Sequence, residues 1–426
     1  MTDAAAKRGW RGRFPALQHR DFRVLWFGMF FSSATMMFQF YAQGWFILGM
    51  TSSAGLLGLL GVSRGTGMLL FSLYGGALAD RMDRRTLLIA TQSTAFGIYG
   101  LLSILVITDH IGLWLAFGMI FLSASVESMD APARQALVPL LVPREHLPNA
   151  VALFIAAQIS SYAFLPPMAG LAIETIGVGG AFALSLIGHV VVVVALLTLR
   201  VRAKPVPSPV TVLRSVGHGI TYATGRPRVL WVLLFGMAVG TLGFPIISTL
   251  APYWMKNELG LGAGGWTLMG WFWGLGTVAS TVTLSTRNSP RHLGRIIIGA
   301  TSGFALSLVL FSLTRSLPLA AIAWCINGTF FSANMIASTS LLQMIVENQY
   351  LGRVMSLRGL SSAVNQMAAA PLGALADGVG IGRMVPSAAA LLAALIIVPT
   401  VLSPTVRTLD AEAQRTDEQE PIPARE

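Results

Sequence analysis

Charged residues are scarce in this sequence of 426 residues, and cysteine is nearly absent. Aspartate, glutamate, lysine and arginine make up 11% of the chain, whereas 54% of the residues are hydrophobic and the mean hydropathy is +0.68. Because a soluble domain carries about 25% charged residues, this composition excludes a soluble globular protein. It indicates an integral membrane protein.

Other features are also missing, and each absence excludes a class of function. The single cysteine, Cys325, excludes an intrachain disulfide, a cysteine-based zinc site and an iron–sulfur cluster, and we interpret it as a small packing residue. No G-x-x-x-x-G-K-[ST] loop occurs, which disfavours a nucleotide-driven pump. A membrane enzyme would need a hydrophilic loop with paired carboxylates or a metal cluster, but the longest internal loop, residues 200–228, contains no acid. We therefore expect no enzyme, no metal and no cofactor.

Long apolar runs dominate the rest of the chain. A helix that crosses the hydrocarbon core needs about 20 apolar residues. Twelve such runs predict an all-α membrane protein with twelve transmembrane helices, at residues 24–48, 54–79, 86–108, 111–133, 148–173, 178–199, 229–254, 263–286, 296–314, 317–343, 354–376 and 384–403.

The basic residues lie almost entirely in every second loop between these spans. All but four of the 29 lysines and arginines fall on one side, which is cytoplasmic because Lys and Arg in short loops are retained there. The exceptions are Lys256, Arg315 and Arg383 on the other side and Arg64 within a span. A nucleic-acid binder would gather its basic residues on one folded surface. We expect a multi-pass protein of the bacterial inner membrane, with lipid around it, both termini in the cytoplasm and no nucleic-acid partner.

The predicted spans fall into two sets of six. The first span begins near Val24 and the seventh near Val229, about half the chain apart, and residues 142–153 weakly resemble residues 346–357. This pattern predicts two pseudo-symmetric six-helix bundles. The expected organisation is a cytoplasmic segment at 1–23, a bundle at 24–199, a basic linker at 200–228 with an amphipathic helix near 210–224, a bundle at 229–403 and a disordered cytoplasmic tail at 404–426.

A short charged segment separates the second and third spans. Its sequence from Gly76 to Arg85, G-A-L-A-D-R-M-D-R-R, resembles the loop between helices 2 and 3 that marks the major facilitator superfamily of transporters. The resemblance implies that superfamily's fold and alternating access by rocking of the two halves. It also implies a cytoplasmic latch, in which a helix 4 acid pairs with Arg84 or Arg85 and Asp80 meets the positive start of helix 11. The latch residues would be Gly76, Asp80, Arg81, Arg84, Arg85, Asp130, Arg134, Gly352 and Arg353.

Further segments are similar to one bacterial branch of this superfamily, that of the enterobactin exporter and related secretion and drug-efflux permeases. They are residues 20–26, 130–139, 147–150 and 351–356. Two positions depart from the pattern. Asp83 stands where the superfamily more often has glycine, and Tyr162 stands where proton antiporters often have arginine in helix 5. The resemblance therefore does not extend to the helix 5 antiporter motif.

Ionisable residues inside spans are functional candidates because burying a charge in the bilayer is costly. Arg64 lies ten residues into the second span, about 15 Å deep. It is interpreted either as an anchor for an anionic or electron-rich substrate, or a partner for a carboxylate during gating, or as a structural ion pair or carbonyl clamp between helices of the first half. Glu127 and Asp130 share a face near the cytoplasmic end of the fourth span. Asp130 is assigned to the latch, whereas for Glu127 a latch role and a proton-carrying role stay open.

Neutral polar residues within the spans complete the predicted substrate or proton pathway. They are Gln39 and Gln43 in the first span, Asn327 and Asn334 in the tenth, and Asn365 and Gln366 in the eleventh. Such side chains can bind hydroxyl and amide groups of a substrate, although hydrogen bonds between helices are their commoner use. His189, in the sixth span, is interpreted as structural.

Together these features predict a secondary active transporter that exports a small amphipathic molecule, such as a siderophore, an antibiotic or another natural product. Protons are the expected coupling ion, which makes the protein an antiporter, and it is expected to function as a monomer. An uptake or facilitated-diffusion permease for a nutrient is the alternative, because only the exporter-like segments favour efflux. A polytopic membrane enzyme is the disfavoured alternative of another class.

Overall fold

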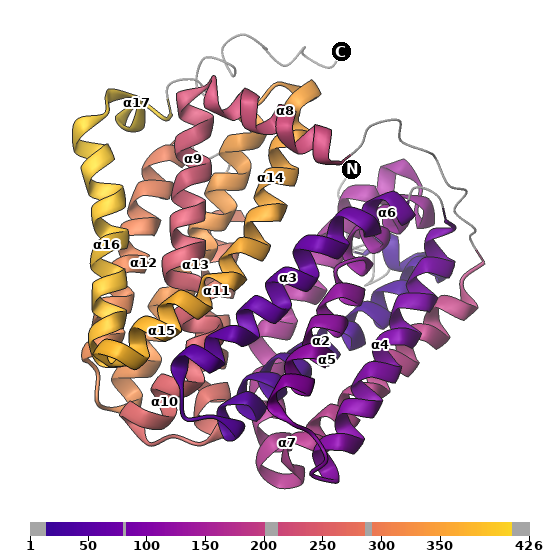
Figure 1. The fold of residues 1–426 in the computed structure, drawn as a ribbon. Coiled ribbons are helices and arrows are strands. Elements are labelled where there is room, and N and C mark those ends of the chain that lie inside the picture. Colours follow the sequence, from indigo (N-terminus) through magenta and orange to yellow (C-terminus); the bar gives the residue numbers. More distant parts are fainter. Residues whose placement is uncertain (1–13, 80–81, 201–211, 286–291, 411–426) are drawn as a thin grey trace, which may run out of the picture. The chain divides into compact units, whose positions relative to one another are not determined.

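The structure, a computed structural model, describes residues 14–79, 82–200, 212–285 and 292–410. Within these ranges every regular element is a helix and no strand occurs (Figure 1). The all-α prediction is therefore confirmed. The chain forms two compact units, one of residues 1–50 and 66–209 and the other of residues 51–65 and 210–426.

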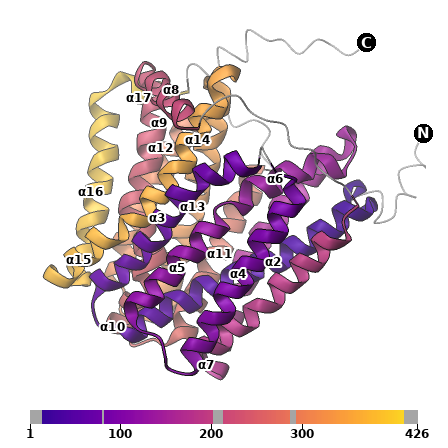
Figure 2. The same cartoon turned by 45° about the vertical axis from the view of Figure 1, so that its right-hand side comes forward.

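The first unit is a bundle in which α2 packs along α7 and α4 packs against α5, α6 and α7 (Figures 1 and 2). Its elements are η1 (Pro15–Gln18), α2 (Arg20–Met50), the second part of α3 (Ala54–Ala79), α4 (Arg84–Ile107), α5 (Leu113–Glu127), α6 (Asp130–Leu141), η2 (Arg144–His146) and α7 (Leu147–Thr198). Apolar residues of α2, α4, α6 and α7, among them Phe22, Leu88 and Leu137, form a shared core. Burial of these side chains joins the helices of this unit.

The second unit is a bundle in which α13 packs between α11 and α12, and α16 packs on α12. Its elements are the first part of α3, α8 (Val212–Thr224), α9 (Pro227–Ala238), the π-helical η3 (Val239–Gly243) and η4 (Ile246–Leu250), α10 (Ala251–Leu259), α11 (Ala263–Ser285), α12 (Leu293–Leu313), α13 (Leu317–Ile345), α14 (Asn348–Met367), α15 (Ala369–Val379), α16 (Ile381–Leu402) and α17 (Pro404–Arg407).

Each predicted span coincides with one helix or with consecutive helices. Spans 148–173 and 178–199 are both contained in α7, where Gly177 interrupts the helical backbone with φ 73° and ψ 174°. Glycine tolerates this positive φ because it has no Cβ. Among the described residues, seven helices are long and apolar enough to cross a membrane, and the one at Arg144–Thr198 contains two predicted spans.

Two segments that flank the second predicted bundle, within the linker 200–228 and the tail 404–426, contain helices in their described parts. The predicted amphipathic helix is present as α8, which packs on α14 (Figure 2). Residues 404–410, expected to be disordered, instead form α17 and a short extension of it. This expectation was wrong because Val406 and Leu409 are buried, and Asp410 accepts a hydrogen bond from the Gly294 amide at 2.5 Å.

The helix α3 contributes to both units, since residues 51–65 belong to the second and its later residues to the first. In the second unit its glycines pack directly on backbone. A Cβ at Gly58 would lie 2.4 Å from the Ala369 carbonyl oxygen, and one at Gly61 would lie 2.1 Å from that of Gln366. Only glycine permits this close approach of two helices.

Candidate functional site

Buried polar side chains of the first unit meet at Tyr99 of α4. Gln43 of α2 donates from Nε2 to the Tyr99 hydroxyl at 2.8 Å, and that hydroxyl donates to Oε1 of Glu127 at 2.9 Å. Gln43 and Tyr99 are buried, and Glu127 is the half-buried last residue of α5. Two residues of the predicted pathway, Gln43 and Glu127, are thus joined through a tyrosine that sequence reasoning did not select.

His189 of α7 lies beside this chain and is also buried. Its Nε2 is 2.9 Å from Nε2 of Gln39, and its Nδ1 is 2.8 Å from Oε1 of Gln92. An amide nitrogen only donates, so this network assigns the proton of a neutral imidazole to Nδ1. The imidazole also stacks on the Tyr99 ring, with centroids 6.0 Å apart.

The structure therefore brings Gln39, Gln43 and Glu127 together through His189 and Tyr99. Sequence reasoning missed both linking residues and Gln92, because a single His or Tyr in an apolar span resembles packing. One signal was available. Gln92 and Tyr99 are seven residues apart, and this spacing puts both on one face of α4.

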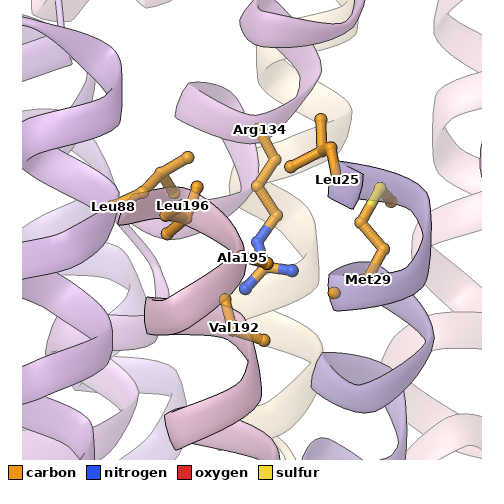
Figure 3. A pocket seen from close by; sticks show the side chains of 8 residues that line it. Leu25, Met29, Leu88, Arg134, Val192, Ala195 and Leu196 are labelled. Atoms are coloured by element: carbon orange, nitrogen blue, oxygen red, sulfur yellow. The ribbon is translucent and has the colours of Figure 1, made fainter. Parts of the chain in front are cut away.

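Asp130 pairs with Arg134 of its own helix, α6, through Arg134 Nε. Thr91 donates a second hydrogen bond to Asp130 Oδ1 at 3.1 Å. Figure 3 shows the guanidinium surrounded by apolar side chains of three helices: Leu25, Met29, Leu88, Val192, Ala195 and Leu196. Two charges held in such surroundings depend on each other, since removal of either leaves the other buried and uncompensated.

In the charged segment between α3 and α4, Asp83 stands directly before the first residue of α4, where the superfamily pattern more often has a glycine. Asp83 Oδ1 accepts hydrogen bonds from the Thr86 amide at 3.0 Å and the Thr86 hydroxyl at 3.2 Å, so Asp83 is the N-cap of α4. Its φ is −59°, a value that needs no glycine. The departure from the superfamily pattern at this position is therefore a capping residue.

Arg85 donates to backbone carbonyl groups at the end of α7, from Nε to Leu196 at 2.7 Å and from Nη2 to Leu197 at 2.8 Å. Unsatisfied carbonyls at a helix end attract a guanidinium, and the described contacts of Arg85 are of this kind. The pairing of a helix 4 acid with Arg84 or Arg85 stays a prediction. Asp80 and Arg81 lie outside the described residues, as does the side-chain environment of Gly76.

The predicted latch residues of helix 11, Gly352 and Arg353, lie in the second turn of α14. Gly352 is exposed and a Cβ there would meet nothing within 4 Å, so close packing does not require this glycine. The Arg353 guanidinium lies 5.2 Å from the centre of the Tyr350 ring. Tyr350 stacks on Tyr222 of α8 at 4.3 Å, which fastens α8 to the start of α14.

Arg64 is half-buried on α3, within the part of that helix that packs on α14. A Cβ at the next residue, Gly65, would lie 2.5 Å from the Ala363 carbonyl oxygen. Gly61, one turn earlier, packs on Gln366 in the same way. Arg64 is therefore at the level of Asn365 and Gln366, so three predicted pathway residues share one layer of the second unit.

Two side-chain oxygens in this layer have no hydrogen-bond partner within the described part of the chain. They are Oδ1 of Asn365 and Oε1 of Gln366, both buried. Gly240 in η3 gives Asn365 its space, since a Cβ there would lie 1.9 Å from Asn365 Nδ2. Buried acceptors normally have a partner, so this layer offers hydrogen-bonding capacity.

The two asparagines of α13 are satisfied by neighbouring helices. Asn327 donates to the Ser307 hydroxyl at 2.8 Å and accepts from Trp273 Nε1 at 3.2 Å. Asn334 donates to the Thr301 hydroxyl at 2.7 Å. Such contacts are typical of side chains that join helices. A pathway role for these two residues stays a prediction.

Comparisons with known proteins agree with this architecture. A family model described as transmembrane secretion effector matches residues 11–424. The enterobactin exporter EntS of Shigella boydii serotype 4 (strain Sb227) is 25% identical over 395 residues, covering 90% of this chain and 91% of the exporter.

Solved transporter structures share the fold at low sequence identity. A POT family transporter in complex with a thioalcohol-conjugated peptide has a TM-score of 0.75 at 14% identity, covering 91% of this chain and 96% of that one. A bacterial homolog to the human lysosomal transporter Spinster, in an inward-facing and unoccupied conformation, has a TM-score of 0.67 at 15% identity, covering 96% and 99%. These likenesses support the fold alone.

Proposed function

Because the chain belongs to the transmembrane secretion effector family of the major facilitator superfamily, a family of transporters and not of enzymes, we propose that it exports a small amphipathic molecule of the siderophore kind. The likeness to an enterobactin exporter along nearly the whole length of both chains supports efflux and this class of substrate. The proposed location is the bacterial inner membrane, with both termini in the cytoplasm, as the distribution of basic residues predicts.

Export against a gradient requires an energy source, and we propose that protons entering the cell supply it. The supporting observation is the chain Gln43–Tyr99–Glu127, which places a carboxyl group at the end of a buried hydrogen-bonded path. A carboxyl in apolar surroundings can bind and release a proton within the physiological range because desolvation disfavours its charged form. Alternating access by rocking of the two halves would then expose Glu127 to each side in turn.

The test is transport by the purified protein in lipid vesicles under an imposed proton gradient. We expect uptake of a catecholate siderophore into inside-out vesicles to stop when the pH gradient and the membrane potential are collapsed. Glu127→Gln should lower gradient-driven transport by about tenfold, while substrate exchange without a gradient continues. Replacement of Glu by Gln removes the titratable proton but keeps the side chain's size.

Glu145→Gln is the matched control, because the Glu145 side chain is 76% exposed and lies in η2. This variant should transport like the parent protein. Transport that is unaffected by collapse of both gradients would contradict proton coupling. Coupled transport that survives in Glu127→Gln would assign the proton to another residue. Movement only in the opposite direction would favour the uptake permease.

A further inference from the structure

The start of α3 is fastened to α15 by one carboxylate. Asp377 accepts hydrogen bonds from the Ser53 hydroxyl at 2.5 Å, from the Ala54 amide at 2.7 Å and from the Gly55 amide at 2.9 Å. The Ser53 hydroxyl also accepts from the Leu56 amide at 3.0 Å, as an N-cap residue does. A negative charge is thus seated on the positive N-terminal end of a helix, a favourable arrangement.

Close packing of small residues extends this contact along the two helices. A Cβ at Gly373 of α15 would lie 2.2 Å from the Ala54 carbonyl oxygen, and one at Gly55 would lie 2.9 Å from Asp377 Oδ2. Gly58 and Gly61 continue the contact one turn at a time. The carboxylate therefore stands at the end of a packed seam, where opening of the seam would begin.

The charges around Asp377 do not include a basic partner among the described residues. Tyr253 of α10 lies within electrostatic range of both Asp377 and Glu258. Glu258 is paired with Arg315 at 3.4 Å. The start of α3 supplies the three hydrogen bonds to the Asp377 carboxylate, so this contact depends on the position of α3.

The titration of Asp377, which lies just past the predicted span 354–376, bears on when this contact holds. Burial by itself raises the pKa of Asp377, but hydrogen bonds from Ser53, Gly55 and Ala54 outweigh it and place the pKa below its ordinary value. A lowered pKa gives stabilisation that is complete above the ordinary carboxyl pKa and is lost only as the pH falls through the lowered value. The charge is therefore present throughout the physiological range.

We propose that Asp377 is a conformational clasp, which holds residues 51–65 of α3 on α14 and α15 and must release them during each transport cycle, when the predicted bundles 24–199 and 229–403 rock apart. This inference rests on the alternating access proposed above. The clasp biases the protein toward the state in which the seam is closed. It is released by separation of the helices and not by protonation, so the coupling proton acts elsewhere.

The test measures how often the seam opens, without using transport. The lone cysteine is first replaced by Cys325→Ser, and Ala369→Cys supplies a reporter. Ala369 is fully buried, and its Cβ lies 2.8 Å from where a Cβ on Gly61 would be. The rate of reaction with N-ethylmaleimide then reports opening. We expect Asp377→Asn to raise this rate by about tenfold, the effect of losing about 1.4 kcal/mol.

Asp410→Asn is the matched control. Asp410 also accepts a hydrogen bond from a helix start in this unit, but the donor is the Gly294 amide of α12 and not a group of α3. It should leave labelling at position 369 unchanged. Ser53→Ala, which removes one of three donors, should give a smaller increase and replaces Asp377→Asn if that variant does not accumulate.

Unchanged labelling in Asp377→Asn and Ser53→Ala would overturn the clasp, and so would an equal increase in Asp410→Asn. The labelling rate of the reporter protein, divided at each pH by the rate at which N-ethylmaleimide reacts with free cysteine, should also be constant from about pH 6 to pH 8, because the carboxylate is charged throughout that range and the division removes the pH dependence of the thiolate. A steep increase toward pH 6 would overturn release without protonation. Labelling does not depend on the substrate, so failure of siderophore export leaves the clasp standing, whereas intact export with unchanged labelling overturns the clasp alone.

Discussion

Single residues in this protein perform tasks that their sequence neighbours do not reveal. Arg85 and Arg84 are adjacent and identical in type, yet Arg85 donates to the Leu196 and Leu197 carbonyls at the end of α7. Asp83, next to them, caps α4. A charged segment that resembles one functional signature thus also contains residues that complete helix ends.

Arg64 supplies the prediction at the scale of the residue. We expect Arg64→Ala to weaken binding of an anionic substrate by about tenfold. Two unit charges about 4 Å apart near a protein surface interact by about 4 kcal/mol, and a tenfold change in affinity corresponds to about 1.4 kcal/mol of this. A neutral substrate should lose much less. Arg64→Lys should restore part of the affinity, because lysine keeps the charge but not the planar fork. Equilibrium binding of one anionic and one neutral compound to the purified variants is the measurement.

Arg64→Ala that lost affinity equally for both compounds would contradict the anchor and support a structural ion pair. Thermal unfolding of the same samples separates the two cases. A variant with lower stability and unchanged preference between compounds has lost a structural contact.

At the scale of the element, the apolar helix α3 is distinguished by glycines that pack closely against other helices. Its glycines at 55, 58, 61 and 65 all face α14 or α15 at distances that exclude a Cβ. Gly67, later in the same helix, instead packs against Phe121 of α5. One continuous helix therefore has closely packed faces in both units.

Gly61→Ala should destabilise the protein by about 1–3 kcal/mol, because the new Cβ would lie 2.1 Å from the Gln366 carbonyl oxygen and the helices would have to separate. Gly97→Ala in α4 is the control, since a Cβ there would meet nothing within 4 Å. It should be neutral or stabilising by up to about 1 kcal/mol, as alanine is the better helix former. Thermal unfolding in detergent compares the two. Equal effects would contradict a seam that requires glycine.

At the scale of the whole molecule, a transporter must be stable in more than one conformation. Some contacts therefore form in one conformation only, whereas others are present in every conformation and stabilise the fold. The buried pair of Asp130 and Arg134 lies within one helix, and the role of these two residues in the latch stays a prediction. The resemblance of residues 76–85 to the superfamily's signature loop predicts that Asp80 and Arg84 make contacts in one conformation only.

Asp80→Asn and Arg84→Ala should therefore reach the membrane in normal amounts but transport slowly, because contacts made in one state alter cycling more than folding. Arg85→Ala should instead reduce abundance and thermal stability, since it leaves two helix-end carbonyls without their donor. Transport rate at matched membrane abundance, measured for all three, decides the matter. Normal rates in Asp80→Asn and Arg84→Ala would contradict the latch.

The sequence by itself determined the class of the protein, the helical segments and the family. Runs of about 20 apolar residues have few alternatives to a helix in lipid, because every backbone polar group must be satisfied within the segment. The charged segment after α3 could be identified from the sequence because the family resemblance rests on residues that are neighbours in the chain. Candidate residues such as Glu127 and Arg64 could be selected because charge within an apolar span is conspicuous.

Only the tertiary structure decided which of these residues meet. Tyr99 and His189 join Gln39, Gln43 and Glu127 through contacts between residues as many as 150 positions apart. Asp377 reaches Ser53 across 324 positions, and nothing near either residue announces the contact. In an apolar span, the sequence around a glycine, glutamine or histidine does not show which neighbouring helix that residue faces. Their role depends on the partner that packing brings to them, and helix periodicity does not identify that partner.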